Sequence, residues 1–331
     1  MNFSTHKRSP KELLSKYAAF AILIAMCLVI TVLRPQQFLS VGNVVSVLSA
    51  SSVYGCMALG ATMIIITGGI DLSAGAILAF AGVIGAAFGQ VSTAPSKVFP
   101  GIADMPFIVP VLAALFAGLL CGLVNGGLIA RFNTPPFIIT LGMTTVVRGA
   151  TMLLTGGEPV SNLVGGYAAM GGLIGGVIPI TVILFLVLVV LAHILLSRTR
   201  FGFDVYAIGS NRRAAEVSGV KVPHRLLTVY GFAGLMYAVA GLISSARAAS
   251  IHPGAAAGYE LTAVAACIIG GASPLGGVGS IINTLAGALI ISVLRNGLTL
   301  LGIDSYWQQI AEGLVIVVAV ALDVRRNRQG K

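Results

Sequence analysis

The sequence predicts an all-α polytopic membrane protein with about ten transmembrane helices. Only 9% of its 331 residues are charged, against roughly 25% in soluble globular domains. The mean hydropathy is +0.99, and several apolar runs reach the ~20 residues that a helix needs to cross a bilayer. The 42 glycines favour close packing of such helices, because small residues let helix backbones approach one another.

The positive charge indicates how the protein is oriented. Fifteen of the 20 Lys and Arg lie in the two tails, at Arg131 and in the segment 197–225. Cytoplasmic segments of membrane proteins carry such an excess. We therefore expect cytoplasmic tails at 1–16 and 323–331 and a transmembrane domain at 17–322 that contains a cytoplasmic loop at 197–225. Nucleic-acid binding is not expected, because no segment outside the membrane is long enough to carry a basic patch.

The predicted spans follow the apolar runs in chain order. They are expected at 17–33, 43–66, 75–90, 107–130, 137–155, 178–196, 226–247, 259–271, 278–297 and 305–322. Residues 1–33 resemble a secretory signal, but no small-x-small cleavage site follows, so we expect an uncleaved first helix. An even number of spans places both basic tails on the same side of the membrane.

Two Gly-rich segments adjoin the two shortest spans. GGIDLSAG occupies 68–75, and GGASPLGG occupies 270–277. Irregular backbone at membrane depth is tolerated only where it is buried in protein or lines a cavity. The two segments look alike, which is consistent with an internal duplication, and we expect a broken or re-entrant region at each. The glycines assigned this structural role are Gly68, Gly69, Gly270 and Gly271.

Few ionisable side chains are expected at membrane depth, where a charge costs at least ~2.5–3.5 kcal/mol. Asp71 lies in the first Gly-rich segment, and we expect it to cap the helix that starts near Ser73. Direct contact with a substrate is the alternative for Asp71. Arg148 lies within the span 137–155 and is expected either to line a pathway or to fix a neighbouring helix.

Arg295 and Glu312 are expected to form a structural ion pair. They are equally distant from the turn LGIDSY, so an antiparallel helix hairpin would place both at the same depth. Pairing would then neutralise both charges. Arg247 and Glu260 are placed similarly around the turn HPGAAAG.

Small residues recur in the span 107–130. Gly118, Gly122 and Gly126 follow one another every four residues, which makes one helical face smooth for close packing. Asn125 lies beside this face and is expected to bond either a neighbouring helix or a polar ligand.

Sequence patterns for catalysis and metal binding are missing. The chain contains no GxxxxGK[ST] phosphate loop, no HExxH and no GxSxG, and its four cysteines show no paired spacing. We therefore expect neither an enzyme nor a metal site, and no cofactor bound by this chain.

The basic loop 197–225 contains a predicted short helix. Ser210 or Asn211 is a suitable N-cap, residues 212–218 have helical propensity, and Gly219 suits the position after the C-cap. A helix of two turns is marginal alone, so we expect it to be ordered by docking onto a partner. The alternative is a solvated basic connector.

Four separated motifs resemble the permeases of bacterial ABC importers for monosaccharides of the ribose/galactose (methyl-galactoside) type. The resemblance covers about residues 38 to 323. Its motifs, in the family's order, are GGIDLSAGAI, FGFDVYAIGSNRRAAEVSGVKV, GYELTAVAACIIGGASPLGGVGS and NGLTLLGIDSYWQQIAEGLVIVVAVALD. The resemblance implies a location in the bacterial inner membrane, with both termini cytoplasmic. It also implies three partners: a second permease subunit, an external sugar-binding protein and a cytoplasmic ATPase that uses ATP and Mg²⁺.

The resemblance further implies that the loop segment inserts into a groove of the ATPase. The contact residues that it assigns are Gly209, Asn211, Ala214, Ala215, Glu216, Ser218 and Gly219. Relatives commonly carry an uncharged residue at the position of Arg295 and a basic one at that of Glu312, so no pathway role is carried over to this hairpin.

A monosaccharide is neutral and polyhydroxylated, so its pathway needs small and weakly polar groups. The candidates are Ser73, Asn125, Thr140 and Arg148. The alternative function is an ion-coupled secondary transporter with inverted repeats. It would need intramembrane carboxylates, for which Asp71 and Glu312 are the obvious candidates.

Overall fold

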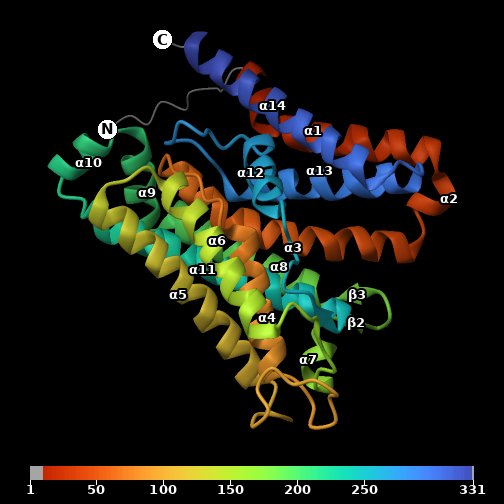
Figure 1. Ribbon diagram of the computed structural model, residues 1–331. Coiled ribbons are helices and arrows are strands. Elements are labelled where there is room, and N and C mark those ends of the chain that lie inside the picture. The colour runs from red at the N-terminus through yellow and green to blue at the C-terminus, as the bar shows by residue number, and fades with distance from the viewer. Residues whose placement is uncertain (1–9, 330–331) are drawn as a thin grey trace.

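The computed structural model describes residues 10–329, which form a bundle of packed helices (Figure 1). The first seven helices are α1 (Pro10–Leu33), α2 (Pro35–Phe38), α3 (Val41–Ile66), α4 (Ala74–Phe88), α5 (Ile108–Phe132), α6 (Pro136–Thr155) and α7 (Gly165–Ala169). They are followed by α8 (Ile180–Arg198), α9 (Arg200–Ser210), α10 (Arg212–Val217), α11 (Val222–Ala248), α12 (Tyr259–Ile269), α13 (Ile281–Leu300) and α14 (Ser305–Gln329). The strands are β1 (Val160–Ser161), β2 (Leu173–Ile174), β3 (Ile178–Pro179) and β4 (Ser250–Ile251).

Each of the predicted spans coincides with a helix of the structure. Six of these helices, α3, α5, α6, α8, α11 and α13, are long and apolar enough to cross a membrane. The apolar part of α1, together with α4 and α12, is shorter. The chain is therefore a helical multi-pass membrane protein, whereas ten crossings stay a prediction. The predicted cytoplasmic tails include residues 1–9 and 330–331, which lie outside the described residues.

Helix α11 lies at the centre of the bundle, where it packs against α3, α4 and α5. Most of its side chains are buried. The expected smooth face of α5 is present: Gly118 lies against Gly234, and Gly122 lies against the carbonyl of Tyr230. A side chain at either glycine would overlap the backbone of α11, so these glycines set the close approach of the two helices.

Helix α3 is the second buried element. All its residues from Ser51 to Ile66 are buried, between α11 on one side and α12 and α13 on the other. In contrast, α8 leaves apolar side chains such as Leu186 and Val190 exposed, as expected for a helix that faces lipid. Figure 1 shows α3 and α13 as two long, neighbouring helices in the upper part of the molecule.

The connections contain structure that the sequence did not predict. β1 pairs with β4, which brings Val160 opposite Ile251, and β2 pairs with β3 in a short hairpin. The first half of the predicted cytoplasmic loop forms α9. Its sequence signal is an N-cap at Thr199 followed by Gly202, Val205 and Ile208, which recur every three residues and are all buried.

Candidate functional site

Helix α10 is the short capped helix expected in the basic loop. Asn211 separates it from α9, and its side-chain Oδ1 accepts a hydrogen bond from the backbone N–H of Ala214 at 3.0 Å. Asn211, rather than Ser210, is therefore the N-cap. The helix ends at Val217, and Gly219 then takes a left-handed conformation with φ of +88°, which glycine adopts without strain.

The predicted contact residues of this segment divide between two faces. Those exposed at the surface are Asn211, Ala214, Glu216, Ser218 and Gly219. Glu216 forms an ion pair with Arg212 at 3.2 Å along this face, and the neighbouring Val217 is 90% exposed. Ala215 is buried, and Gly209 faces the membrane helices. The exposed face is thus free to meet a partner, while the other two residues attach the segment to its own chain.

Helix α9 joins α10 to both Gly-rich regions. Gly209 lies so close to the carbonyl of Ile66 and the N–H of Gly277 that a side chain at 209 would overlap them. The N–H of Gly277 itself donates to the Ile66 carbonyl at 2.8 Å, and the hydroxyl of Tyr206 donates to the carbonyl of Gly279 at 2.8 Å. Burial raises the pKa of Tyr206, which keeps this hydroxyl protonated as a donor.

A second contact fixes α9 to the start of α11. Arg225 forms an ion pair with Asp204 at 2.6 Å, and its guanidinium lies 5.9 Å from the centre of the Phe201 ring. A hollow of about 450 Å³ opens beside this pair. Its lining residues are Asp204, Ser218, Gly219, Val220, Lys221, His224 and Arg225.

The first Gly-rich segment contains a buried hydrogen-bond network. Asp71 Oδ1 accepts from the N–H of Ser73 at 2.8 Å and from its hydroxyl at 2.6 Å. Ser73 is the N-cap of α4, so Asp71 bonds the residue at which that helix starts, and its role as a helix cap stays a prediction. Asn125 donates to the Ser73 hydroxyl at 2.9 Å, and Thr140 accepts from the N–H of Leu72 at 3.1 Å. In this conformation the side chains of Asp71, Ser73, Asn125 and Thr140 are buried, and their role in a pathway stays a prediction.

The glycines assigned to the two breaks lie at turns and close contacts. Gly68 and Gly271 have φ of +81° and +85°. Gly69 lies against the hydroxyl of Tyr230, and Gly270 lies against the backbone of Asn283. A broken helix end is therefore present in each region, and whether either segment re-enters the membrane stays a prediction.

Arg148 fixes the segment that leads into α12. Its Nη1 donates to the carbonyls of Pro253 at 3.0 Å and Ala255 at 2.8 Å. It also lies near enough to Glu260 to interact with it electrostatically. The turn geometry had suggested Arg247 as the partner of Glu260, whereas in the structure Arg148 interacts with Glu260 electrostatically. The sequence could not show this, because the contacts join residues more than 100 positions apart.

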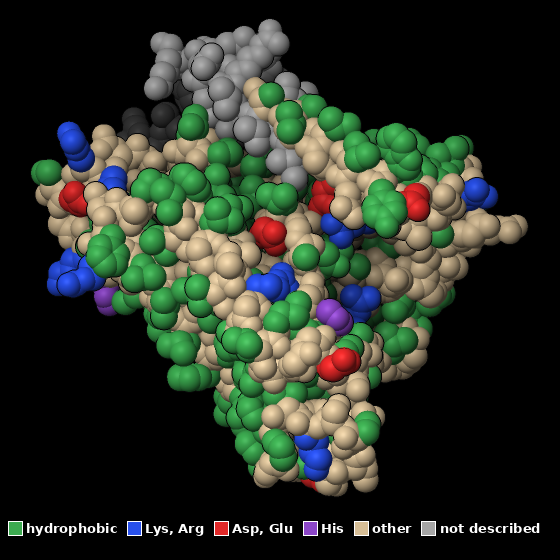
Figure 2. Space-filling view, viewed as in Figure 1, with side chains coloured by type: hydrophobic (Ala, Val, Ile, Leu, Met, Phe, Trp, Pro, Cys, Tyr) green, Lys and Arg blue, Asp and Glu red, His purple; other side chains and the backbone are tan. Residues whose placement is uncertain are grey.

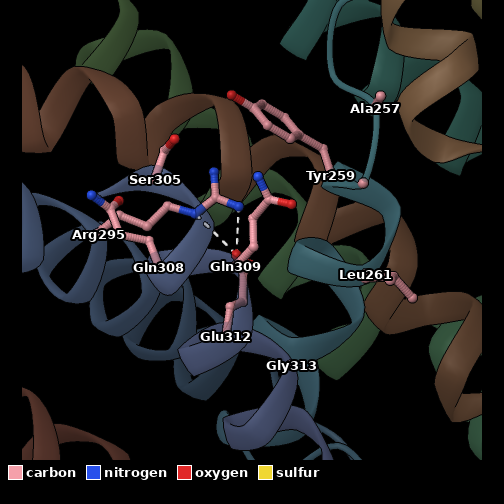
Figure 3. A pocket seen from close by; sticks show the side chains of 10 residues that line it. Ala257, Tyr259, Leu261, Arg295, Ser305, Gln308, Gln309, Glu312 and Gly313 are labelled. Carbon is pink, nitrogen blue, oxygen red and sulfur yellow. Dashed lines mark hydrogen bonds and ion pairs between the residues drawn. The ribbon is translucent and has the colours of Figure 1, made fainter. Parts of the chain in front are cut away.

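Arg295 and Glu312 form the expected ion pair (Figure 3). Glu312 Oε2 accepts from Arg295 Nε at 3.1 Å and from Nη2 at 2.5 Å. The guanidinium also donates to the hydroxyls of Tyr54 at 2.8 Å and Thr262 at 3.1 Å, and it lies 5.3 Å from the centre of the Tyr259 ring. Arg295 thus joins α3, α12, α13 and α14 at one point.

The described residues 10–329 contain no cluster of three or more His, Cys, Asp or Glu side chains that could hold a metal ion. The structure is a bundle of membrane helices in which the exposed helix α10 is attached, through α9, to the two Gly-rich segments.

The comparisons with known proteins agree with this geometry. Residues 43–320 match the family described as "Branched-chain amino acid transport system / permease component". The chain belongs to this permease family. It is 38% identical to the galactose/methyl galactoside import permease protein MglC of Escherichia coli K12 over 96% of each chain. It is 36% identical to the ribose import permease protein RbsC of the same strain over 96% of each chain. RbsC of Bacillus subtilis is 37% identical over 95% of this chain and 94% of its own. No solved structure matches the chain significantly.

Proposed function

We propose that this chain is the membrane-spanning permease subunit of an ATP-driven ABC importer that translocates a monosaccharide of the galactose or ribose class. The attachment of α10 carries the proposal. This helix exposes a capped surface, while the adjoining α9 contacts the ends of both Gly-rich segments through Gly209. A displacement of α10 by a partner would therefore reach α3, α12 and α13 directly.

The energy source lies on a partner. The sequence contains no phosphate-binding loop, so ATP and Mg²⁺ would be used by a separate cytoplasmic ATPase, which closes on ATP and moves α10. An external sugar-binding protein would supply affinity, and a second permease subunit would complete the pathway. The permease then only switches access, which is a population shift driven by differential binding.

The same proposal fixes the orientation in the bacterial inner membrane. If α10 faces the cytoplasm, the basic segments on either side of it obey the positive-inside rule. With ten membrane helices, some of them half-length beside Gly-rich re-entrant segments, both termini would also be cytoplasmic. Ser73, Asn125, Thr140 and Arg148 would then line the pathway when the buried network around the first Gly-rich segment opens.

The relatives and the charges of the chain support the proposed class of substrate. The relatives are named as importers of galactose, methyl galactoside and ribose, and these are neutral molecules. The two carboxylates that an ion-coupled transporter could use are engaged in the structure: Asp71 with Ser73, and Glu312 with Arg295. This arrangement supports a neutral substrate over a coupled ion.

The test is uptake of radiolabelled D-galactose, methyl galactoside and D-ribose into proteoliposomes that hold the permease with its ATPase and sugar-binding protein. We expect ATP-dependent uptake. Glu216→Lys and Gly219→Leu should reduce both ATPase copurification and uptake. The first reverses a charge on the exposed face of α10, and the second strains the left-handed turn that follows the helix. Glu158→Lys is the matched control, since Glu158 is an exposed carboxylate on another connection.

Normal uptake in both α10 variants would overturn the coupling assignment. Uptake that follows a proton gradient and persists without any ATPase would instead establish the ion-coupled alternative.

A further inference from the structure

We infer that the cavity between α12, α13 and α14 is a binding site for a neutral sugar in transit; this inference rests on the proposed function. The cavity has a volume of about 340 Å³, at the small end of the ~300–1,000 Å³ of typical small-molecule sites. It is lined by Ala257, Gly258, Tyr259, Leu261, Arg295, Ser305, Gln308, Gln309, Glu312 and Gly313. Figure 3 shows Tyr259 of α12, Arg295 of α13, and Gln309 and Glu312 of α14 around it.

One acceptor beside this cavity is buried and unsatisfied. Glu312 is only 7% exposed, and its Oε2 is engaged by Arg295. Within residues 10–329, its other oxygen, Oε1, is buried without a hydrogen-bond partner. Leaving a buried acceptor unpaired costs roughly 1–3 kcal/mol, and more for a charged group. A shift of the carboxylate that turns Oε1 toward the cavity would let a ligand hydroxyl donate to it and remove this penalty.

The other groups of the cavity suit a sugar. Each sugar hydroxyl both donates and accepts, and the Gln309 amide offers one group of each kind. The Tyr259 ring is held edge-on to Tyr54 with 5.0 Å between ring centres. The Arg295 guanidinium lies over one face of the Tyr259 ring, so a sugar ring could pack its C–H groups against the other face. Because Arg295 and Glu312 neutralise each other, the site carries no net charge, as a neutral ligand requires.

The exposure of this face argues against lipid as the occupant. Gln309 is exposed on a predicted membrane helix, and the unsatisfied Glu312 lies one turn further along it. Hydrocarbon chains could bond neither of them. The space-filling view shows acidic and basic side chains close together on one side of the molecule, among hydrophobic and uncharged polar surface (Figure 2). A water-filled pathway explains polar groups at this place.

The first experiment measures occupancy without transport. In the permease complex with Cys27, Cys56, Cys121 and Cys267 replaced by alanine, Gln309→Cys and Leu261→Cys are labelled with a charged, water-soluble thiosulfonate. We expect D-galactose or D-ribose to slow labelling of both cysteines, about tenfold at a concentration ten times the Kd. Labelling of Gln37→Cys, an exposed residue of α2, should be unaffected. The sugar affinity should be weak, because a transit site must release its ligand.

The second experiment measures uptake. Gln309→Ala should lower the uptake rate about three- to tenfold, the value of one hydrogen bond, with unchanged sugar affinity of the external binding protein. Gln37→Ala is the control and should import normally.

The outcomes separate the inference from the proposed function. The inference is overturned, and the proposed function stands, if the wild type imports sugar but sugar does not slow labelling of the cavity cysteines and Gln309→Ala imports at the normal rate. If the cavity cysteines are labelled only by an apolar reagent, the surface faces lipid. Protection that depends on the second permease subunit and not on sugar would identify a subunit contact, and either result overturns the inference. If the wild type imports none of the sugars, the proposed function fails and the inference with it.

Discussion

Gly209 of α9 lies directly against the backbone carbonyl of Ile66, at the end of α3. The same carbonyl accepts a hydrogen bond from Gly277 at 2.8 Å. Three segments that are far apart in sequence therefore share one backbone oxygen. Because the contact is between backbones, neither side can yield by changing a rotamer, and a movement of α9 must displace the two Gly-rich regions.

Gly209→Ala tests this contact. In an ordinary helix the change from glycine to alanine is stabilising by up to ~1 kcal/mol. At position 209 the added methyl would overlap backbone atoms, so we expect a destabilisation of about 1–3 kcal/mol and a loss of uptake. Thermal unfolding and transport of the purified complex are the measurements. Gly142→Ala is the control, because nothing lies within 4 Å of a side chain added at Gly142. Equal behaviour of the two variants would show that the close contact is unimportant.

Asn211→Ala should weaken docking of the ATPase through loss of the N-cap. The cap contributes about 1 kcal/mol, which corresponds to roughly fivefold in association. Asn211→Asp keeps an acceptor at the same place and should restore most of the affinity. Titration of the purified ATPase against the permease in nanodiscs measures both. If Asp fails to rescue, the amide itself contacts the partner.

Charge reversal examines the pair of Arg295 and Glu312. Arg295→Glu and Glu312→Arg alone each leave a buried charge facing a like charge, and we expect losses of about 3–5 kcal/mol in stability. The double variant should recover part of this loss. Recovery will be incomplete, because Arg295 also donates to Tyr54 and Thr262. A double variant no better than the single ones would contradict the ion pair.

Gly122→Leu and Gly127→Leu form a matched pair on α5. Gly122 lies against the backbone of Tyr230, whereas a side chain at Gly127 would meet only the end of Leu227, at 3.8 Å. We expect the first change to separate α5 from α11, with a loss of at least ~1–3 kcal/mol, and the second to be tolerated. The measurements are the yield of folded protein in detergent and the melting temperature of each variant. Similar losses in both variants would mean that the face of α5 is not set by close packing.

Local sequence signals predicted much of this molecule. The positions of the membrane helices follow from apolar runs, and α10 follows from Asn211 and Gly219, whose conformational preferences act within one turn. Equal spacing from a turn was enough to pair Arg295 with Glu312, because a helix hairpin converts sequence distance into depth.

Contacts between distant segments could not be predicted in this way. Two examples depend on the packing of several helices. One is the contact of Gly209 with Ile66 and Gly277, and the other is the pair of hydrogen bonds from Arg148 to the segment before α12. The Gly-rich pattern showed that close approach was needed, but glycine carries no side chain that specifies its neighbour. The cavity beside Glu312 was missed for a related reason: the expected pairing with Arg295 accounts for one carboxylate oxygen, and only the packed structure shows that the other is buried and unsatisfied.

The exposed helix α10 has a consequence for the production of the subunit in the cell. It has only six residues, and it leaves Val217 almost entirely in water. A helix of this length depends on its neighbours for order, and exposed segments of low local stability are the places where proteases first cut a chain. If the proposed ATPase covers this helix, a permease made in excess of the ATPase would be cut here first, and turnover would keep the two subunits in balance.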